Sequence, residues 1–161
     1  MEAQDFRLAK ALAVNSSVLD DVIRLFIQRV IQSQETPGGS GVQFAEDEDA
    51  PFALTGTLHR RVVDIEFENA VLEDSENSDK HLIAHVTMYL RESGSERRRL
   101  PSPIFILTSG TTYLIKDYVI RLDDDNCSPA SLALLRNSLS ELILSEIHPT
   151  LHFYKDMRDI N

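Results

Sequence analysis

Two runs of this sequence alternate between apolar and polar residues, and this alternation constrains the fold more than any other feature. The first run, 60–72, sets apolar against acidic positions: Val63, Ile65, Phe67 and Val71 against Asp64, Glu66 and Glu68. The second run, 81–92, sets Leu82, Ala84, Val86, Met88 and Leu90 against Ile83, His85, Thr87, Tyr89 and Arg91. A period of two is typical of half-buried strands in antiparallel sheets. The short polar connections 73–80 and 93–99 are those of hairpins, so we expect antiparallel pairing of the two runs.

Two more segments complete the predicted fold. The strand-like run 103–122 is broken by Ser109-Gly110, which predicts a bulge or bend. Residues 129–147 carry apolar side chains at three- and four-residue steps, with Ser128 as N-cap, and Pro149 ends the segment. We therefore predict a single α+β domain over 1–161: a four-stranded antiparallel sheet, a long C-terminal helix packed on it and a short N-terminal helix.

The N-terminal third is harder to assign. Residues 3–14 have a helix-like apolar face. Residues 18–32 fit a helix through Val22, Phe26 and Val30, but they also fit a β-branched strand, and periodicity leans slightly towards helix. Glycines and an acidic cluster over 34–50 predict a flexible acidic loop on the surface.

Composition excludes several classes of function. There are 26 acidic and 16 basic residues, a formal net charge of -10, which argues against binding a nucleic-acid backbone. Cys127 is the only cysteine, so no intramolecular disulfide forms. The N-terminus lacks the basic and apolar regions of a signal peptide, and no apolar run approaches the roughly 20 residues that cross a bilayer. We expect a cytoplasmic protein that does not insert into membranes.

No motif in the sequence predicts catalysis. His85-Val86-Thr87 has the His-x-Thr form that two-histidine phosphoesterases use twice, but no second copy exists. His81 and His85, with His59 elsewhere, have no spacing specific to metal ligands. Cys127 precedes a helix but has no partner histidine and acid that would activate it. The sequence predicts no enzyme, no catalytic residue, no metal and no cofactor, and the basic run 97–99 is expected to be a solvated hairpin tip.

From Val22 onward the order of segments resembles the SecB export chaperones, including the branch associated with toxin–antitoxin loci. Residues 22–28 resemble the first strand of that family, and Glu35-Thr36-Pro37 its closing Glu-x-Pro. Runs 63–68, 82–90 and 105–115 resemble the following strands. The helix 129–147 with 148–153 resembles the long helix and its Pro-x-Leu continuation. On this resemblance, 18–32 is assigned mainly to a strand.

The resemblance implies a non-enzymatic chaperone that binds unfolded or extended protein segments in apolar grooves, in protein export or toxin–antitoxin control. The expected client-binding residues lie near the bent fourth strand and the tail: Tyr113, Ile115, Tyr118, Ile147, Leu151 and Phe153. A homo-oligomer, either dimer or tetramer, is expected because the sheet and the helix carry more apolar surface than one layer covers.

The resemblance also bears on a translocase ATPase, which the family docks through acidic residues of the sheet. Glu35 matches one such position, but Ile31 and Thr108 stand at two others, while Glu66 and Glu68 could compensate from the second strand. We expect weak docking or none, since isolated exposed charges contribute little. Two alternatives stay open: another small acidic binding protein, such as a dedicated secretion chaperone or an immunity protein, and a phosphoesterase built on His85.

Overall fold

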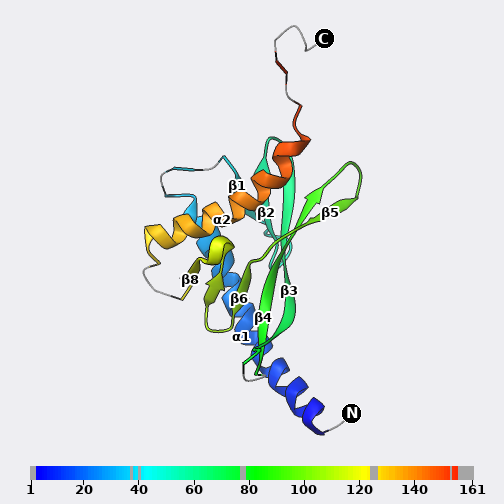
Figure 1. Cartoon of the computed structure of the whole chain (residues 1–161), viewed down its shortest axis with the longest axis vertical. Coiled ribbons are helices and arrows are strands. Elements are labelled where there is room, and N and C mark those ends of the chain that lie inside the picture. The colour runs from blue at the N-terminus through cyan, green and yellow to red at the C-terminus, as the bar shows by residue number, and fades with distance from the viewer. Residues whose placement is uncertain are drawn as a thin grey trace.

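The protein is described by a computed structural model that covers residues 3–36, 38–39, 41–76, 79–123, 127–152 and 154–155 (Figure 1). The chain runs through α1 (Ala3–Ser33), β1 (Gln43–Glu46), β2 (Leu54–Leu58), β3 (Arg61–Glu73), β4 (Lys80–Arg91), β5 (Arg97–Leu100), β6 (Phe105–Leu107), β7 (Thr111–Tyr113), the 3-10 turn η1 (Ile115–Asp117), β8 (Val119–Arg121), α2 (Pro129–Ile147) and η2 (His148–Thr150). The class is α+β, as the sequence predicts.

The prediction of a four-stranded sheet is wrong. The sheet is antiparallel and eight-stranded, in the order β1-β2-β3-β4-β6-β7-β8, with β5 also paired to β4, and it curls into a half-barrel. The run 103–122 yields three short strands instead of one bent strand. Gly110 sits at φ +89, where a left-handed residue reverses the chain between β6 and β7, and η1 makes the next reversal. The expected flexible loop 34–50 also contains β1.

The predicted central hairpin is confirmed. β3 and β4 pair antiparallel in an unbroken register from Val63↔Leu90 to Glu73↔Lys80. Val63, Ile65, Val86, Met88 and Leu90 are buried, as their alternation predicts. The predicted solvated tip at 97–99 is instead β5, which continues the hairpin beside the end of β4.

The assignment of 18–32 to a strand is also wrong, because these residues belong to α1, a single helix of 31 residues. Its buried side chains recur at helical spacing: Leu19, Val22, Ile23, Phe26, Ile27 and Val30. A strand would bury only alternate positions, whereas the helix buries all six against the sheet and α2. Phe26 meets Phe67 of β3 edge to face, with ring centroids 5.5 Å apart. The short helix expected at 3–14 is the first part of this element.

The second helix is found where the sequence places it. α2 spans Pro129–Ile147, and the Ser128 side chain accepts a hydrogen bond from the Ser131 backbone N–H at 3.1 Å. Its apolar stripe packs into the inside of the curled sheet, where a Cβ built on Gly56 would lie 2.9 Å from Ile143. Within the described ranges, no helix combines the length and the apolar character needed to span a membrane.

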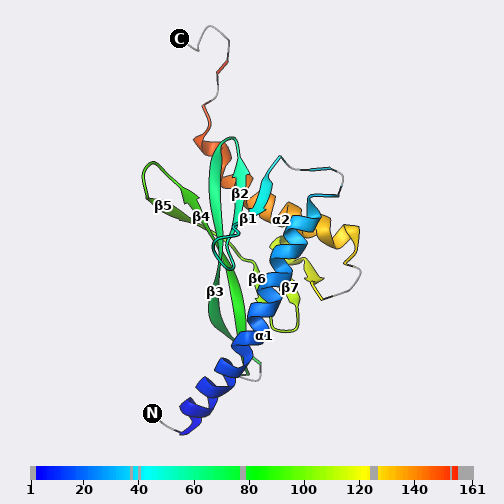
Figure 2. The ribbon, with the colours of Figure 1, turned by 180° about the vertical axis from the view of Figure 1, so that it is seen from behind.

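Both helices cover the inner face of the sheet, and Figure 2 shows α1 crossing it beside β6 and β7. We call the opposite side the outer face. One edge is closed by a side chain: the Gln34 amide accepts from Phe44 N at 2.7 Å and donates to Phe44 O at 2.8 Å. The amide therefore takes the place of a neighbouring strand along β1.

Candidate functional site: the outer face of the sheet

One half of the outer face is a lattice of opposite charges. Arg91 donates to both carboxylate oxygens of Asp64, the closer contact at 2.6 Å, and this hydrogen bond raises the pKa of Arg91. Arg97 pairs with Glu66, lies 3.6 Å from Asp64 and stacks over the Tyr89 ring at 4.4 Å. These side chains come from β3, β4 and β5, whose register brings alternate residues to one face. The acidic side of β3 is thus largely neutralised by arginines.

This lattice bears on the predicted docking residues. Glu66 and Glu68 do face outward from β3, but Glu66 pairs with Arg97 and Glu68 lies 3.7 Å from Arg99. Glu35 is exposed in the turn after α1, on a different element. The structure therefore groups two of the three predicted docking residues and gives both of them an arginine partner.

The other half of the outer face is an apolar groove. Phe105 of β6 and Tyr113 of β7 stack with ring centroids 4.6 Å apart and an interplanar angle of 16°. The groove has a volume of about 460 Å³, and its remaining lining comes from the end of the β3–β4 hairpin and from β6: Leu72, Glu73, Asp74, Ser75, His81 and Leu107. The floor is thus aromatic and aliphatic, while one rim is acidic.

Strand register creates this groove. Leu72 pairs with His81, His85 with Phe105, and Phe105 with Tyr113, so these side chains share a face. The residues between them, such as Ile106, point inward and are fully buried. Burying one face commits the other to solvent, since the side-chain period in a strand is two. The groove can hold an extended apolar segment, with aromatic rings as the main contact surface.

The predicted client-binding residues do not form one surface. Tyr113 lies in the groove and is 36% exposed. Ile115 and Tyr118 line a separate depression against α2, together with Lys116 and Leu134. Ile147 is fully buried in the core, and Leu151 packs partly buried against it. Phe153 lies outside the described residues.

Sequence reasoning missed most of the groove. Phe105, Leu107, Leu72 and His81 were not singled out as binding residues. Residues 104–107 are all apolar, so the sequence does not show that Ile104 and Ile106 are buried while Phe105 and Leu107 face outward. What sequence could not supply was the pairing that brings these strands beside the hairpin end.

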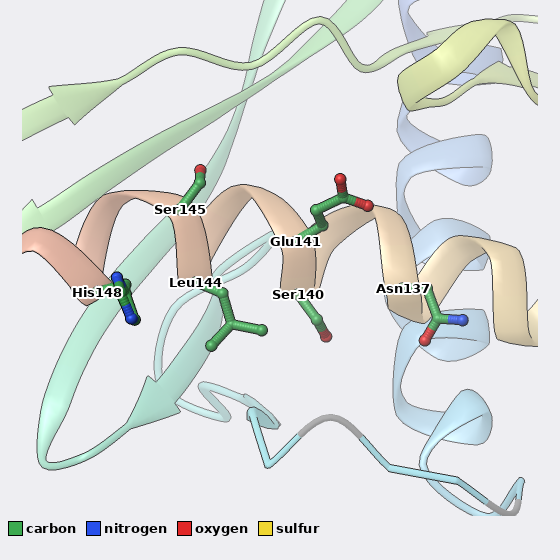
Figure 3. Close-up of a pocket in the computed structure, with 6 residues that line it drawn as sticks. All are labelled: Asn137, Ser140, Glu141, Leu144, Ser145 and His148. Atoms are coloured by element: carbon green, nitrogen blue, oxygen red, sulfur yellow. The ribbon is translucent and has the colours of Figure 1, made fainter.

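A larger depression, about 620 Å³, lies along the solvent side of α2 and is lined by Asn137, Ser140, Glu141, Leu144, Ser145 and His148 (Figure 3). Ser140 and His148 are eight residues apart, roughly 12 Å along a helix, too far for a nucleophile and its base. Glu141 points away from Ser140 in Figure 3 and pairs with Lys116 at 3.2 Å. The depression thus brings no catalytic set together.

His81 and His85 both lie on β4 and form no catalytic pair. The Nε2 atom of His85 lies 2.7 Å from the Ser102 carbonyl oxygen, to which it donates a hydrogen bond. His81 is four residues away on the same strand, roughly 13 Å along it, so the two rings do not form a pair for proton transfer. Among the residues that the structure describes, no group of three possible ligands is placed to hold a metal ion. Cys127 is buried beside the start of α2.

Comparison with family models, curated proteins and solved structures gives no significant match.

Proposed function

We propose that the protein is a non-enzymatic chaperone that holds extended, apolar segments of other proteins in the groove of its outer face. The stacked pair of Phe105 and Tyr113 carries this proposal. Both side chains reach solvent although the inner face is well packed, so the fold leaves a ready apolar surface that its own core does not use. Burial of apolar area is non-directional, which allows one groove to accept many sequences.

The charge distribution supports the same function. The arginine lattice and the acidic rim at Glu73 and Asp74 keep polar surface around the groove, and the net charge of -10 disfavours non-specific aggregation. A role in protein export or toxin–antitoxin control is proposed from the SecB-like resemblance of 63–68, 82–90 and 129–147, since residues 22–28 belong to α1 and do not form that family's first strand. Docking on a translocase ATPase is expected to be weak, since Ile31 and Thr108 stand at two of the expected acidic positions and isolated exposed charges contribute little.

Self-association is part of the proposal as well. The N-terminal part of α1 projects beyond the sheet in Figures 1 and 2, and it exposes Phe6, Val14 and Val18. A second copy that packs on this projecting segment would cover these side chains. Light scattering at micromolar concentration should give a mass above 18.2 kDa. A clean monomer that stays monomeric as the protein concentration is raised would contradict this part.

The groove is tested by binding of permanently unfolded proteins. The chain contains no tryptophan, so the fluorescence of tryptophan in a reduced, carboxymethylated client reports binding without background. Tyr113→Ser should weaken binding several-fold, because it removes half of the aromatic stack. Tyr118→Ser is the matched control, since Tyr118 is similarly exposed but lies outside the groove. Equal effects of the two substitutions would reject the groove.

Binding selectivity separates this function from the alternative of an immunity protein or dedicated secretion chaperone. A general chaperone should bind several unrelated unfolded proteins with similar affinity, whereas the alternative would bind one folded partner and none of them. His85→Ala should leave binding unchanged. A loss of phosphoesterase turnover in that variant would instead favour the catalytic reading of His85.

A further inference from the structure

The C-terminal half of β3 has a free edge. β2 pairs with β3 only from Arg61 to Ile65, whereas β4 pairs with β3 as far as Glu73. Among the strands that the structure describes, none lies beside residues 66–73 on the side away from β4. In Figures 1 and 2 this half of β3 forms the outer margin of the sheet. A long unpaired edge is unusual, because it is a template for another strand.

The backbone groups that face this edge follow from the hydrogen bonds on the other side. Asp74 N donates to Asp79 O at 2.7 Å, so even-numbered residues of β3 bond to β4. The backbone N–H of Val86 donates to Ile104 O, on the side of β4 away from β3. Phe67 is opposite Val86 in the register, so Phe67 makes no backbone hydrogen bond with β4. The N–H and C=O groups of Phe67, Asn69, Val71 and Glu73 therefore point out from the edge.

The edge lacks most of the features that block strand addition. It contains no proline, and the register with β4 has no bulge. Its two faces differ in chemistry. Phe67 and Val71 lie on the inner side, and Val71 is 49% exposed. Glu66 and Glu68 lie on the outer side, with side chains 45% and 58% exposed.

We propose that this edge binds an extended segment that alternates apolar and basic residues and adds to the sheet as a further strand beside β3. Backbone hydrogen bonds to the odd-numbered residues supply the register, as in other cases of strand addition. Apolar side chains of the segment lie beside Phe67 and Val71. Its Lys or Arg side chains lie beside Glu66 and Glu68, whose half-exposed carboxylates can accept from a second cation besides Arg97 and Arg99. The edge is a second site, and its binding does not depend on the groove.

Charge favours a foreign segment over a second copy. An antiparallel pair centred on Val71 would set Glu68 opposite Asp74 of the second copy, and each copy carries a net charge of -10. Like charges directly opposite one another are destabilising in a sheet. A basic segment gains attraction where a second copy meets repulsion.

The test uses the whole protein and a synthetic peptide of eight residues that alternates Val with Lys or Arg and carries one tryptophan at its end. Two N-methylated versions are compared. Methylation of the alternate amides that face β3 should abolish binding, while methylation of the other alternate amides should leave it within about threefold, since only one edge of the peptide is used. Loss of binding in both versions, or in neither, overturns the proposal.

Variants of the protein give an independent readout. Val71→Pro removes an N–H that points out from the edge but breaks no bond to β4, so it should weaken peptide binding at least tenfold. Replacing Glu66 and Glu68 together with Gln should lower affinity several-fold and reduce its dependence on salt, whereas Glu48→Gln, in the exposed acidic cluster, should change neither. Unchanged affinity in Val71→Pro overturns the proposal. If Val71→Pro fails to fold, the paired glutamate variant decides.

Hydrogen exchange identifies the occupant. The amides of Phe67, Asn69 and Val71 should exchange fast in the free protein and slow down when the peptide is added. If these amides exchange slowly in the free protein, and still more slowly as its concentration rises, a second copy occupies the edge. Slow exchange independent of concentration would show that the chain itself covers it. Either result overturns the proposal, and neither bears on client binding at Tyr113.

Discussion

Replacement of Arg136 should lower the free energy of unfolding more than replacement of any exposed charged residue does. Arg136 lies in the middle of α2 and is 3% exposed, and its guanidinium holds the C-terminal end of α1. Nη1 donates to Ser33 O at 3.1 Å, to Thr36 O at 2.9 Å and to Thr36 Oγ1 at 2.6 Å, and Nη2 donates to Gly38 O at 3.2 Å. A cation here also complements the negative end of the α1 dipole.

The magnitude follows from what is left behind. In Arg136→Met the methionine side chain fills the space of the arginine methylene groups, but it cannot donate hydrogen bonds. The backbone carbonyl groups that accept from Arg136 stay buried and lose their donor. Hydrogen bonds from a charged group contribute about 1.5–3 kcal/mol each, and a buried acceptor without a partner costs about 1–3 kcal/mol. Because these bonds share one side chain, they do not add fully. We expect a loss of about 3–5 kcal/mol of unfolding free energy, from several buried acceptors left without a donor at these costs.

Urea unfolding monitored by far-ultraviolet circular dichroism measures this loss. Arg98→Met is the control, because Arg98 is 44% exposed and pairs with Glu92 and Glu146 at the surface, so it should cost less than about 1 kcal/mol. Arg136→Lys keeps the charge but loses the planar fork, and should fall between the two. A stability of Arg136→Met within 1 kcal/mol of the parent protein would refute the reasoning.

Three further predictions concern other contacts. Gly56→Ala should cost about 1–3 kcal/mol in urea unfolding, since its Cβ would lie 2.9 Å from Ile143, and the double variant with Ile143→Val should recover part of the loss if this clash is the cause. Ser128→Ala should cost about 1 kcal/mol by removing the N-cap of α2, and no change would show that the cap bond does not form. Hydrogen bonds from Arg121 lower the pKa of Asp123, so the carboxylate stays charged below its ordinary range, and the pair stabilises the fold above about pH 4 and is lost as pH falls through the lowered pKa. An NMR titration should give a midpoint below the ordinary aspartate value that returns towards it in Arg121→Gln.

The sequence by itself determined the elements whose signal is local. Alternation over 60–72 and 81–92 needs only that one face of a strand be buried, and β3 and β4 form as predicted. The Ser128 cap, the leucine spacing and Pro149 likewise define α2 without reference to the rest of the chain. These signals lie in neighbouring residues, so they can be recognised without knowledge of the tertiary structure.

Tertiary structure decided everything that depends on which segments meet. Residues 18–32 fit both a period of two and a period of 3.6, with a slight lean towards helix, and the resemblance to SecB favoured the strand. The curled inner face, which accepts Leu19, Phe26 and Val30 together, selects the helix. The short strands β1, β6, β7 and β8 are too brief to show a period. The groove and the free edge of β3 arise from pairing between distant segments, and β2 ends beside Ile65 while β3 continues to Glu73. No local pattern encodes where a neighbouring strand stops, because that is set by the geometry of the whole sheet.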